Sequence, residues 1–324
     1  MEFVDLLNSL PGAIAQGLIW GIMAIGVYIS YKILDIADLT VDGSICTGAC
    51  VCAVLITKGV PAWLSIILAF VAGALTGVIT GLLHTAFGIP SILAGILTQL
   101  SLYSINLKII GSANKGISSS QYDVLVALKY VKGVPWYENT IFIVAVITVV
   151  IIALLYWFFG TSLGCSLRAT GSNQNMSRAQ GINTKFNTIL GLMISNGLVA
   201  LSSALYSQYQ GFTDINMGRG AIVIGLAAVI IGGVIFERIF KNFALKLLSV
   251  SLGAVVYYIV LQTVIWMGFD TDLLKLLSAL VVAIFLAVPY WKKTYMPAIL
   301  SMKKRMAIRK NNKAVLASRK EGAK

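Results

Sequence analysis

Six long apolar runs constrain the fold of this chain more than any other feature of its sequence. They cover residues 12–34, 61–83, 139–160, 187–205, 247–266 and 273–290. Each reaches or approaches the roughly 20 residues that an α-helix needs to cross about 30 Å of hydrocarbon. Because lipid offers the backbone no hydrogen-bond partners, such segments must be helical. The sequence therefore predicts an all-α, polytopic transmembrane helical bundle.

The composition leads to the same class. Of the 324 residues, 58% are hydrophobic and only 11% are charged, whereas a soluble domain carries roughly 25% charged residues. The sequence starts with acidic residues, and its first apolar run is too long for the core of a signal peptide, so we expect a retained first span.

We expect about nine spans, with an external N-terminus and a cytoplasmic C-terminus. They are residues 12–34, 43–58, 62–83, 90–110, 139–160, 186–208, 219–236, 245–266 and 272–290. The second and seventh are short, which is typical of broken or re-entrant helices that line a protein-enclosed path. Residues 1–291 would form the transmembrane domain and residues 292–324 a basic cytoplasmic tail.

The charge distribution fits this orientation with one exception. Eleven of the 25 basic residues lie from Lys292 onward, and residues 160–186 carry three bases and no acid. Cytoplasmic segments of membrane proteins are enriched in Lys and Arg, so both segments are expected in the cytoplasm. Residues 111–138 carry three lysines against two acids, yet the span count places them outside.

Two polar loops, residues 35–43 and 211–218, each connect a long span to a short one and end in glycine. An odd number of crossings separates them, so the two halves would have opposite orientation. That is the layout of an inverted repeat, whose broken helices mark the transport path in many transporters. The sequence similarity between the loops is weak, and the repeat stays a possibility.

The acids of these loops are candidates for a substrate pathway, because charges at membrane depth are costly. The candidate residues are Asp35, Asp38, Thr40, Asp42, Asp214 and Asn216. The alternative is an ordinary interfacial turn with Asp42 or Ser44 as a helix N-cap, or a solvated loop around Asp214. Helix N-termini near Gly43 and Gly218 would present positive dipole ends to a substrate carboxylate.

The sequence gives little support for an enzyme or a metal-binding protein. His84 is the only histidine, and Cys46, Cys50 and Cys52 lie in an apolar segment as small buried residues. Neither a catalytic triad nor a phosphate-binding Gly-x-x-x-x-Gly-Lys-Ser/Thr loop occurs, and we expect no catalytic residue, cofactor or metal. Glycines at Gly73, Gly77 and Gly81 predict close helix packing, more readily inside one chain than between two copies.

The polar, basic segment 161–191 carries a family resemblance. It contains Gly164, Arg168-Ala169-Thr170-Gly171, Ala179 and Gly181-Ile182-Asn183, and a short helix over 173–180 is expected to end at Gly181. Together with Gly232-Gly233 and residues 37–44, these motifs resemble the permeases of branched-chain amino acid and ribose-type ABC importers. The resemblance covers about residues 12–290 and is closest to the tryptophan/tyrosine-type subgroup.

The resemblance implies a function and a set of partners. The loop 161–186 would be a coupling element that docks on a separate ABC ATPase, through Gly164, Arg168, Ala169, Gly171, Asn173, Ala179, Gly181 and Ile182. Further partners would be an extracytoplasmic substrate-binding lipoprotein, a second permease copy in a homodimer, and membrane lipid, but no nucleic acid. The solute would be an amino acid, aromatic or related, imported across a bacterial inner or plasma membrane.

The alternative is a secondary transporter or channel that works alone. The intramembrane Asp residues would then be ion or proton sites. Ion-driven uptake in vesicles without an ATPase would distinguish this alternative from the importer.

Overall fold

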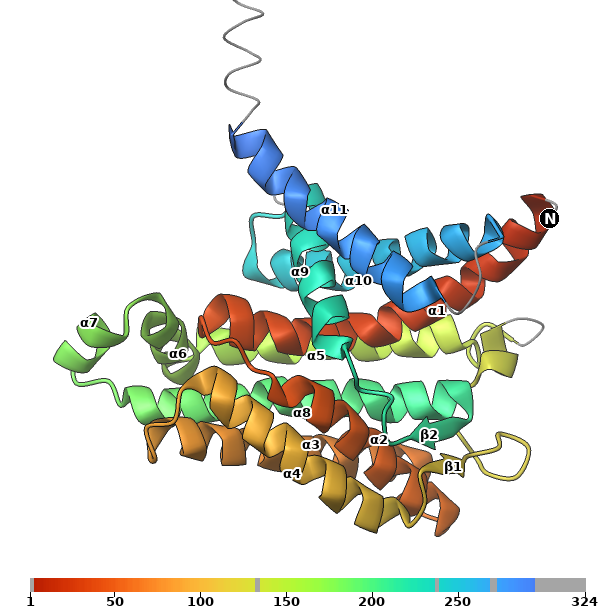
Figure 1. Cartoon of the computed structure of the whole chain (residues 1–324), viewed down its shortest axis with the longest axis horizontal. Coiled ribbons are helices and arrows are strands. Elements are labelled where there is room, and N and C mark those ends of the chain that lie inside the picture. Colours follow the sequence, from red (N-terminus) through yellow and green to blue (C-terminus); the bar gives the residue numbers. More distant parts are fainter. Residues whose placement is uncertain (1–2, 132–134, 237–238, 269–272, 295–324) are drawn as a thin grey trace, which may run out of the picture. The chain divides into compact units, whose positions relative to one another are not determined.

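The structure is a computed structural model that describes residues 3–131, 135–236, 239–268 and 273–294. Its elements are α1 (Phe3–Tyr28), η1 (Ile29–Ile33), α2 (Thr40–Thr57), α3 (Ala62–Thr85), α4 (Ser91–Ile110), β1 (Asn114–Gly116), η2 (Leu128–Val131), α5 (Thr140–Gly160), α6 (Ser162–Ser172), α7 (Gln174–Ala179), α8 (Thr184–Gln210), β2 (Phe212–Asp214), α9 (Ala221–Phe236), α10 (Phe243–Trp266) and α11 (Leu274–Thr294) (Figure 1). The chain divides into two compact units, Met1–Ser278 and Ala279–Lys324, and all the features discussed below lie in the first. Most of the predicted basic tail lies outside the described residues.

The predicted spans are confirmed as helices. Seven described helices are long and apolar enough to cross a membrane, and α9 is a shorter apolar helix of 16 residues. The first span differs from the prediction because α1 starts at Phe3 and continues through Pro11. The two predicted short spans correspond to α2, with 18 residues, and α9. The fold is the predicted all-helical membrane bundle.

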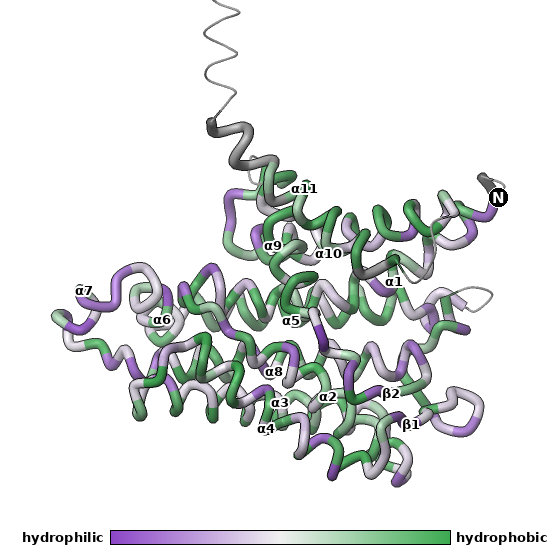
Figure 2. Tube along the Cα trace, viewed as in Figure 1, coloured by the Kyte–Doolittle hydropathy of each residue, from purple (hydrophilic) through white to green (hydrophobic). Residues whose placement is uncertain are grey.

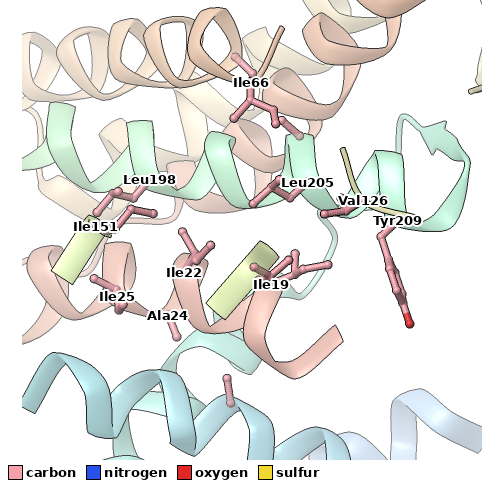
Figure 3. Close-up of a cluster of buried hydrophobic side chains, with 14 of the residues drawn as sticks. Ile19, Ile22, Ala24, Ile25, Ile66, Val126, Ile151, Leu198, Leu205 and Tyr209 are labelled. Carbon is pink, nitrogen blue, oxygen red and sulfur yellow. The ribbon is translucent and has the colours of Figure 1, made fainter. Parts of the chain in front are cut away.

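Helices α1 and α8 form the antiparallel centre of the first unit. Hydroxyl groups of α8 donate to carbonyl oxygens of α1 at three levels: Ser195 to Gly26 at 2.8 Å, Ser202 to Ile19 at 2.7 Å, and Tyr209 to Gly12 at 3.2 Å. Figure 3 shows side chains of both helices, such as Ile22 and Leu198, gathered in the same apolar cluster. These hydrogen bonds satisfy side-chain hydroxyls that lipid could not.

Helix α2 runs parallel to α8, and therefore antiparallel to α1. Ser44 contacts Asn196, and eight residues further along each helix Cys52 contacts Ala204. The long helix α1 is thus followed by a shorter, antiparallel helix, α2. The long helix α8 is likewise followed by a shorter helix, α9.

The direction of α9 completes this relation. Close contacts pair Gly232 with Ser249 and Gly253 with Ala228, so α9 is antiparallel to α10. Helix α10 is in turn antiparallel to α1, because Gly17 faces Val255 and Gly21 faces Ser251. Helix α9 therefore follows the direction of α1 and opposes α8. The predicted opposite orientation of the two helix pairs is confirmed.

Glycines bring several of these helices into backbone contact. An added Cβ at Gly73 would lie 2.5 Å from the Asn196 carbonyl oxygen, and one at Gly81 would lie 2.9 Å from the Ile189 Cα. Gly77 is packed on the Leu192 carbonyl in the same way. The glycine row of α3 therefore packs against α8 of the same chain, as predicted.

The two ends of the bundle differ in structure and charge. At one end α6 and α7 project beyond the long helices, and at the other β1 pairs antiparallel with β2, with Asn114 opposite Asp214 (Figure 1). Hydrophilic residues gather at these ends while the long helices between them are largely hydrophobic (Figure 2). The described bases at the α6–α7 end are Lys32, Arg168, Arg178, Lys185, Lys241 and Lys246. The described N-terminal residues lie at the opposite end, because Gly12 contacts Tyr209 near β2.

Candidate functional site

The first membrane helix ends in a π-helix and an irregular segment. Helix α1 continues into the π-helix η1, and beyond it the Asp35 backbone adopts the left-handed conformation with φ 57°. The following residues form no regular structure before α2 starts at Thr40. They pass α4 where Gly95 leaves room, since a Cβ there would lie 2.8 Å from the Leu39 nitrogen. Non-helical backbone at membrane depth is tolerated only where it is buried in protein or lines a water-filled cavity.

Asp38 sits at the centre of this break and is 3% exposed. Its Oδ1 accepts a hydrogen bond from the Thr40 backbone N–H at 2.9 Å, at the positive end of α2. Its Oδ2 accepts from the Asn196 side-chain amide of α8 at 2.7 Å. The carboxylate therefore stabilises the start of α2 and ties it to the middle of α8.

Hydroxyl groups extend this polar layer across neighbouring helices. Thr40 and Thr80 are 2.7 Å apart, and Thr80 donates to Thr98 at 3.0 Å. One turn further along α2, Ser44 lies 2.7 Å from Thr76 and donates to the Asn196 side-chain oxygen at 2.6 Å. The layer connects α2, α3, α4 and α8, and every group in it has a partner.

Asp42 connects the two halves of the chain. Its carboxylate accepts from the backbone N–H groups of Gly220 and Ile222, both at 3.0 Å, and so caps α9. Gly218 makes this approach possible, because its Cα is packed against the Asp42 carbonyl oxygen. A cap for α2 itself was one sequence-based interpretation; Asp42 instead caps a helix that begins 179 residues later. Asp38 and Asp42 thus bind first-turn N–H groups of α2 and α9. A contact between these helix ends and a substrate carboxylate stays a prediction.

A cavity of about 330 Å³ lies beside this cap. Its walls come from α2, α4 and the loop that precedes α9: Asp42, Gly43, Cys46, Gln99, Leu100, Tyr103, Asn106, Ile215 and Arg219. Arg219 forms no ion pair with the described residues. The cavity thus places an acid, a free guanidinium, an amide and a phenol ring within one small volume.

Asn106 is the least satisfied polar group of this cavity. It is fully buried, and neither its side-chain nitrogen nor its oxygen has a hydrogen-bond partner among the described residues. A buried amide without partners costs about 1–3 kcal/mol, so such a group indicates a role for a ligand or water. Sequence reasoning missed Gln99, Tyr103 and Asn106, although their spacing places all three on one face of α4.

The predicted pathway residues occupy different positions. Asp42 lines the cavity, whereas Asp38 and Thr40 belong to the buried polar layer beside it. Asp35 lies exposed in the turn after η1. Asp214 lies in β2 and accepts from the backbone N–H of Asn216 at 2.6 Å, as part of an outer turn.

The segment 161–186 forms two helices that meet at Asn173. Arg168 of α6 donates to the Phe159 carbonyl at 3.0 Å, and its guanidinium lies 5.8 Å from the ring centre of Phe243. Gly171 is packed on the Ile33 carbonyl of η1, where a side chain would not fit. Helix α6 is thus fastened to α5, α10 and the break after α1.

Helix α7 is the outer part of this segment, close to where a short helix was predicted. The Asn173 side chain caps it by accepting from the Met176 N–H at 3.0 Å, and Gly181 ends it with φ 79°. Met176 is 60% exposed at its surface. Of the remaining predicted residues, Gly164 is buried against Phe159, and Ile182 donates its N–H to Ser177 at 3.0 Å. Ala169 is partly buried in α6 and Ala179 is exposed on α7.

Broken helices in pairs of opposite direction, with a polar cavity beside them, are features of many membrane transport proteins. The chain belongs to the family described as "Branched-chain amino acid transport system / permease component", whose profile matches residues 10–288. It is therefore a multi-pass membrane protein and the permease component of an ABC-type transporter.

Characterised and uncharacterised bacterial proteins are similar over most of the chain. A tyrosine transport system permease protein of Clostridioides difficile is 37% identical over 87% of this chain and 91% of its own length. An uncharacterised protein of Rickettsia prowazekii is 38% identical over 87% of this chain and 98% of its own length. The fructose import permease protein FruF of Bifidobacterium longum is 25% identical over 86% of this chain and 76% of its own length.

Proposed function

We propose that this chain is the membrane-spanning subunit of an ATP-driven importer of an amino acid, aromatic or related, in a bacterial inner or plasma membrane. The similarity at 37% identity to a tyrosine transport permease carries this proposal. A separate ABC ATPase would act from the cytoplasm on the segment 161–186, and an external binding lipoprotein would deliver the solute. Two copies of the chain would form the pore.

The cavity beside Asp42 is suited to a zwitterion. Arg219 offers a guanidinium to an α-carboxylate, and Asp42 offers a carboxylate to an ammonium group. The unpartnered amide of Asn106 would gain hydrogen bonds from the same solute. Tyr103 supplies an aromatic wall that favours a ring side chain.

A continuous set of contacts leads from α6, which α7 follows in the chain, to this cavity. Gly171 rests on Ile33 of η1, which is followed by the break that holds Asp38. Helix α2 begins there and carries Asp42, which caps α9 and lines the cavity. We infer that a push on α6 and α7 moves the start of α2, and with it the cavity wall. Proximity supports this route, and a coupling measurement must establish it.

Asp38 gives the stand-alone transporter no support. It is 3% exposed, and both of its carboxylate oxygens accept hydrogen bonds, from the Thr40 backbone and the Asn196 amide. Capping of α2 is a sufficient reason for its presence at membrane depth. Asp42 caps α9 and also lines the cavity, where it would serve the solute in the importer.

Reconstitution with the ATPase and binding lipoprotein tests the proposal. Met176→Asp should abolish association with the ATPase and ATP-dependent uptake of labelled tyrosine, because it places a charge on the exposed face of α7. Leu128→Asp is the matched control, since Leu128 is an exposed apolar residue, 61% accessible, near the β1–β2 end. Uptake driven by an ion gradient without any ATPase, or full association of the Met176→Asp variant, would contradict the proposed function.

A further inference from the structure

A second cavity lies at the α6–α7 end of the bundle and is lined by cations. Its volume is about 450 Å³, and Lys32, Arg168, Lys241 and Lys246 line it together with Tyr28. These four bases come from η1, α6, the segment before α10, and α10 itself. Four distant parts of the sequence thus converge on one basic cavity.

The described residues supply no acid to this cavity. None of its lining residues is Asp or Glu, and Lys32, Lys241 and Lys246 make no ion pair within the described part of the chain. Glu237, the acid of the loop between α9 and α10, lies outside the described residues. Four positive charges within one cavity repel each other, so an anion bound there would relieve the repulsion.

An apolar groove of about 310 Å³ continues from the basic cavity. The two share Tyr28, Lys32 and Lys246, and the groove extends along α9 and α10 past Val229 and Val250. A ligand that fills both must join an anionic group to a hydrocarbon chain.

Gly233 keeps the groove open. A Cβ built at Gly233 meets no atom within 4 Å, although Gly233 lines the groove. Its neighbour Gly232 faces the opposite way, in contact with the Ser249 carbonyl of α10. Helix packing therefore does not require a glycine at position 233. The space that a side chain would fill there is part of the groove.

We propose that the basic cavity and the groove together bind one anionic phospholipid, with its phosphate among Lys32, Arg168, Lys241 and Lys246 and an acyl chain along α9 and α10. Basic pockets between helices on the cytoplasmic side suit the phosphate headgroups of inner-leaflet lipids. This placement in the inner leaflet rests on the proposed function, which assigns the α6–α7 end to the cytoplasm. The bound lipid would join η1, α6 and α10 beside the coupling segment.

Native mass spectrometry of the detergent-purified full chain tests this site. Phosphatidylglycerol and phosphatidylcholine with identical acyl chains are offered in competition, with inorganic phosphate in excess as a third arm. We expect one tightly retained phosphatidylglycerol per chain, which phosphatidylcholine and phosphate do not displace. The double variant Lys32→Gln/Lys246→Gln should bind it about 30-fold more weakly, at about 1 kcal/mol per lysine.

Matched variants separate the site from general charge effects. Lys58→Gln/Lys108→Gln removes the same charge at the opposite end of the bundle and should leave retention unchanged. Gly233→Leu keeps every charge, fills the groove, and should lower retention at least tenfold while the elution volume stays that of the folded protein. Equal retention of both lipids, equal retention by all variants, or displacement by inorganic phosphate would overturn the proposal. These outcomes do not depend on an ATPase or on uptake, so they are independent of the importer assignment.

Discussion

The cap that Asp42 provides for α9 can be tested through the thiol of Cys46. Asp42→Asn removes the charge and leaves one acceptor for two N–H groups, those of Gly220 and Ile222. Gly220 is exposed, so water can replace its partner, whereas Ile222 is partly buried. We therefore expect a loss of about 1–2 kcal/mol in the local stability of the start of α9, within the range for N-caps and charged hydrogen bonds.

The thiol reports this loss directly. Cys46 is 6% exposed, and its Sγ donates to the Ile215 carbonyl at 3.0 Å, so the loop before α9 covers it. The rate at which a maleimide labels Cys46 measures how often the loop before α9 opens. The assay uses a chain whose other three cysteines are replaced by alanine or serine. At about 1.4 kcal/mol per factor of ten, Asp42→Asn should raise the rate about 5–30-fold.

The matched control is Asp35→Asn, which removes an equal charge seven residues away. Asp35 is exposed and caps no helix, and Asn tolerates its left-handed backbone well. Its labelling rate should equal that of the parent chain. An unchanged rate in Asp42→Asn, or the same rise in both variants, would refute the capping argument.

Two further results follow from the packing and from the cavity. Gly232→Ala should lower the thermal unfolding temperature in detergent, because its methyl group meets the Ser249 carbonyl. Gly233→Ala, at the open neighbouring position, should leave that temperature unchanged. Equal effects of the two variants would contradict the faces assigned to these glycines. Asn106→Leu should raise that temperature, since it removes an unpartnered buried amide worth about 1–3 kcal/mol, and should reduce tyrosine uptake; a destabilised variant would show that Asn106 has partners.

The fold was largely predictable because hydrophobicity determines it. Lipid requires apolar helices of a certain length, and that requirement is visible in consecutive residues. The short lengths of α2 and α9 also predicted the broken-helix pairs, since a segment too short to cross fully must meet other parts of the protein. The described bases at the α6–α7 end agree with the predicted side of the segment 161–186.

The site was less predictable because its contacts join distant residues. Nothing near Asp42 in the sequence indicates that its partners are Gly220 and Ile222. Helical spacing places Gln99, Tyr103 and Asn106 on one face of α4, but spacing alone does not show whether that face meets lipid, protein or a cavity. The motif residues Arg168 and Gly171 have structural contacts inside the chain, and their role in coupling stays a prediction.

The arrangement of caps also determines how the protein must be assembled. Synthesis proceeds from the N-terminus, so α2 leaves the ribosome before Asn196, Gly220 and Ile222 have been made. Asp42 lies in the first turn of α2 and Asp38 just before it, so neither carboxylate has its final partners when α2 first emerges. Because a charged group without partners is costly at membrane depth, we expect the start of α2 to stay hydrated until α8 and α9 have been inserted. The polar contacts at this break would then form late in assembly.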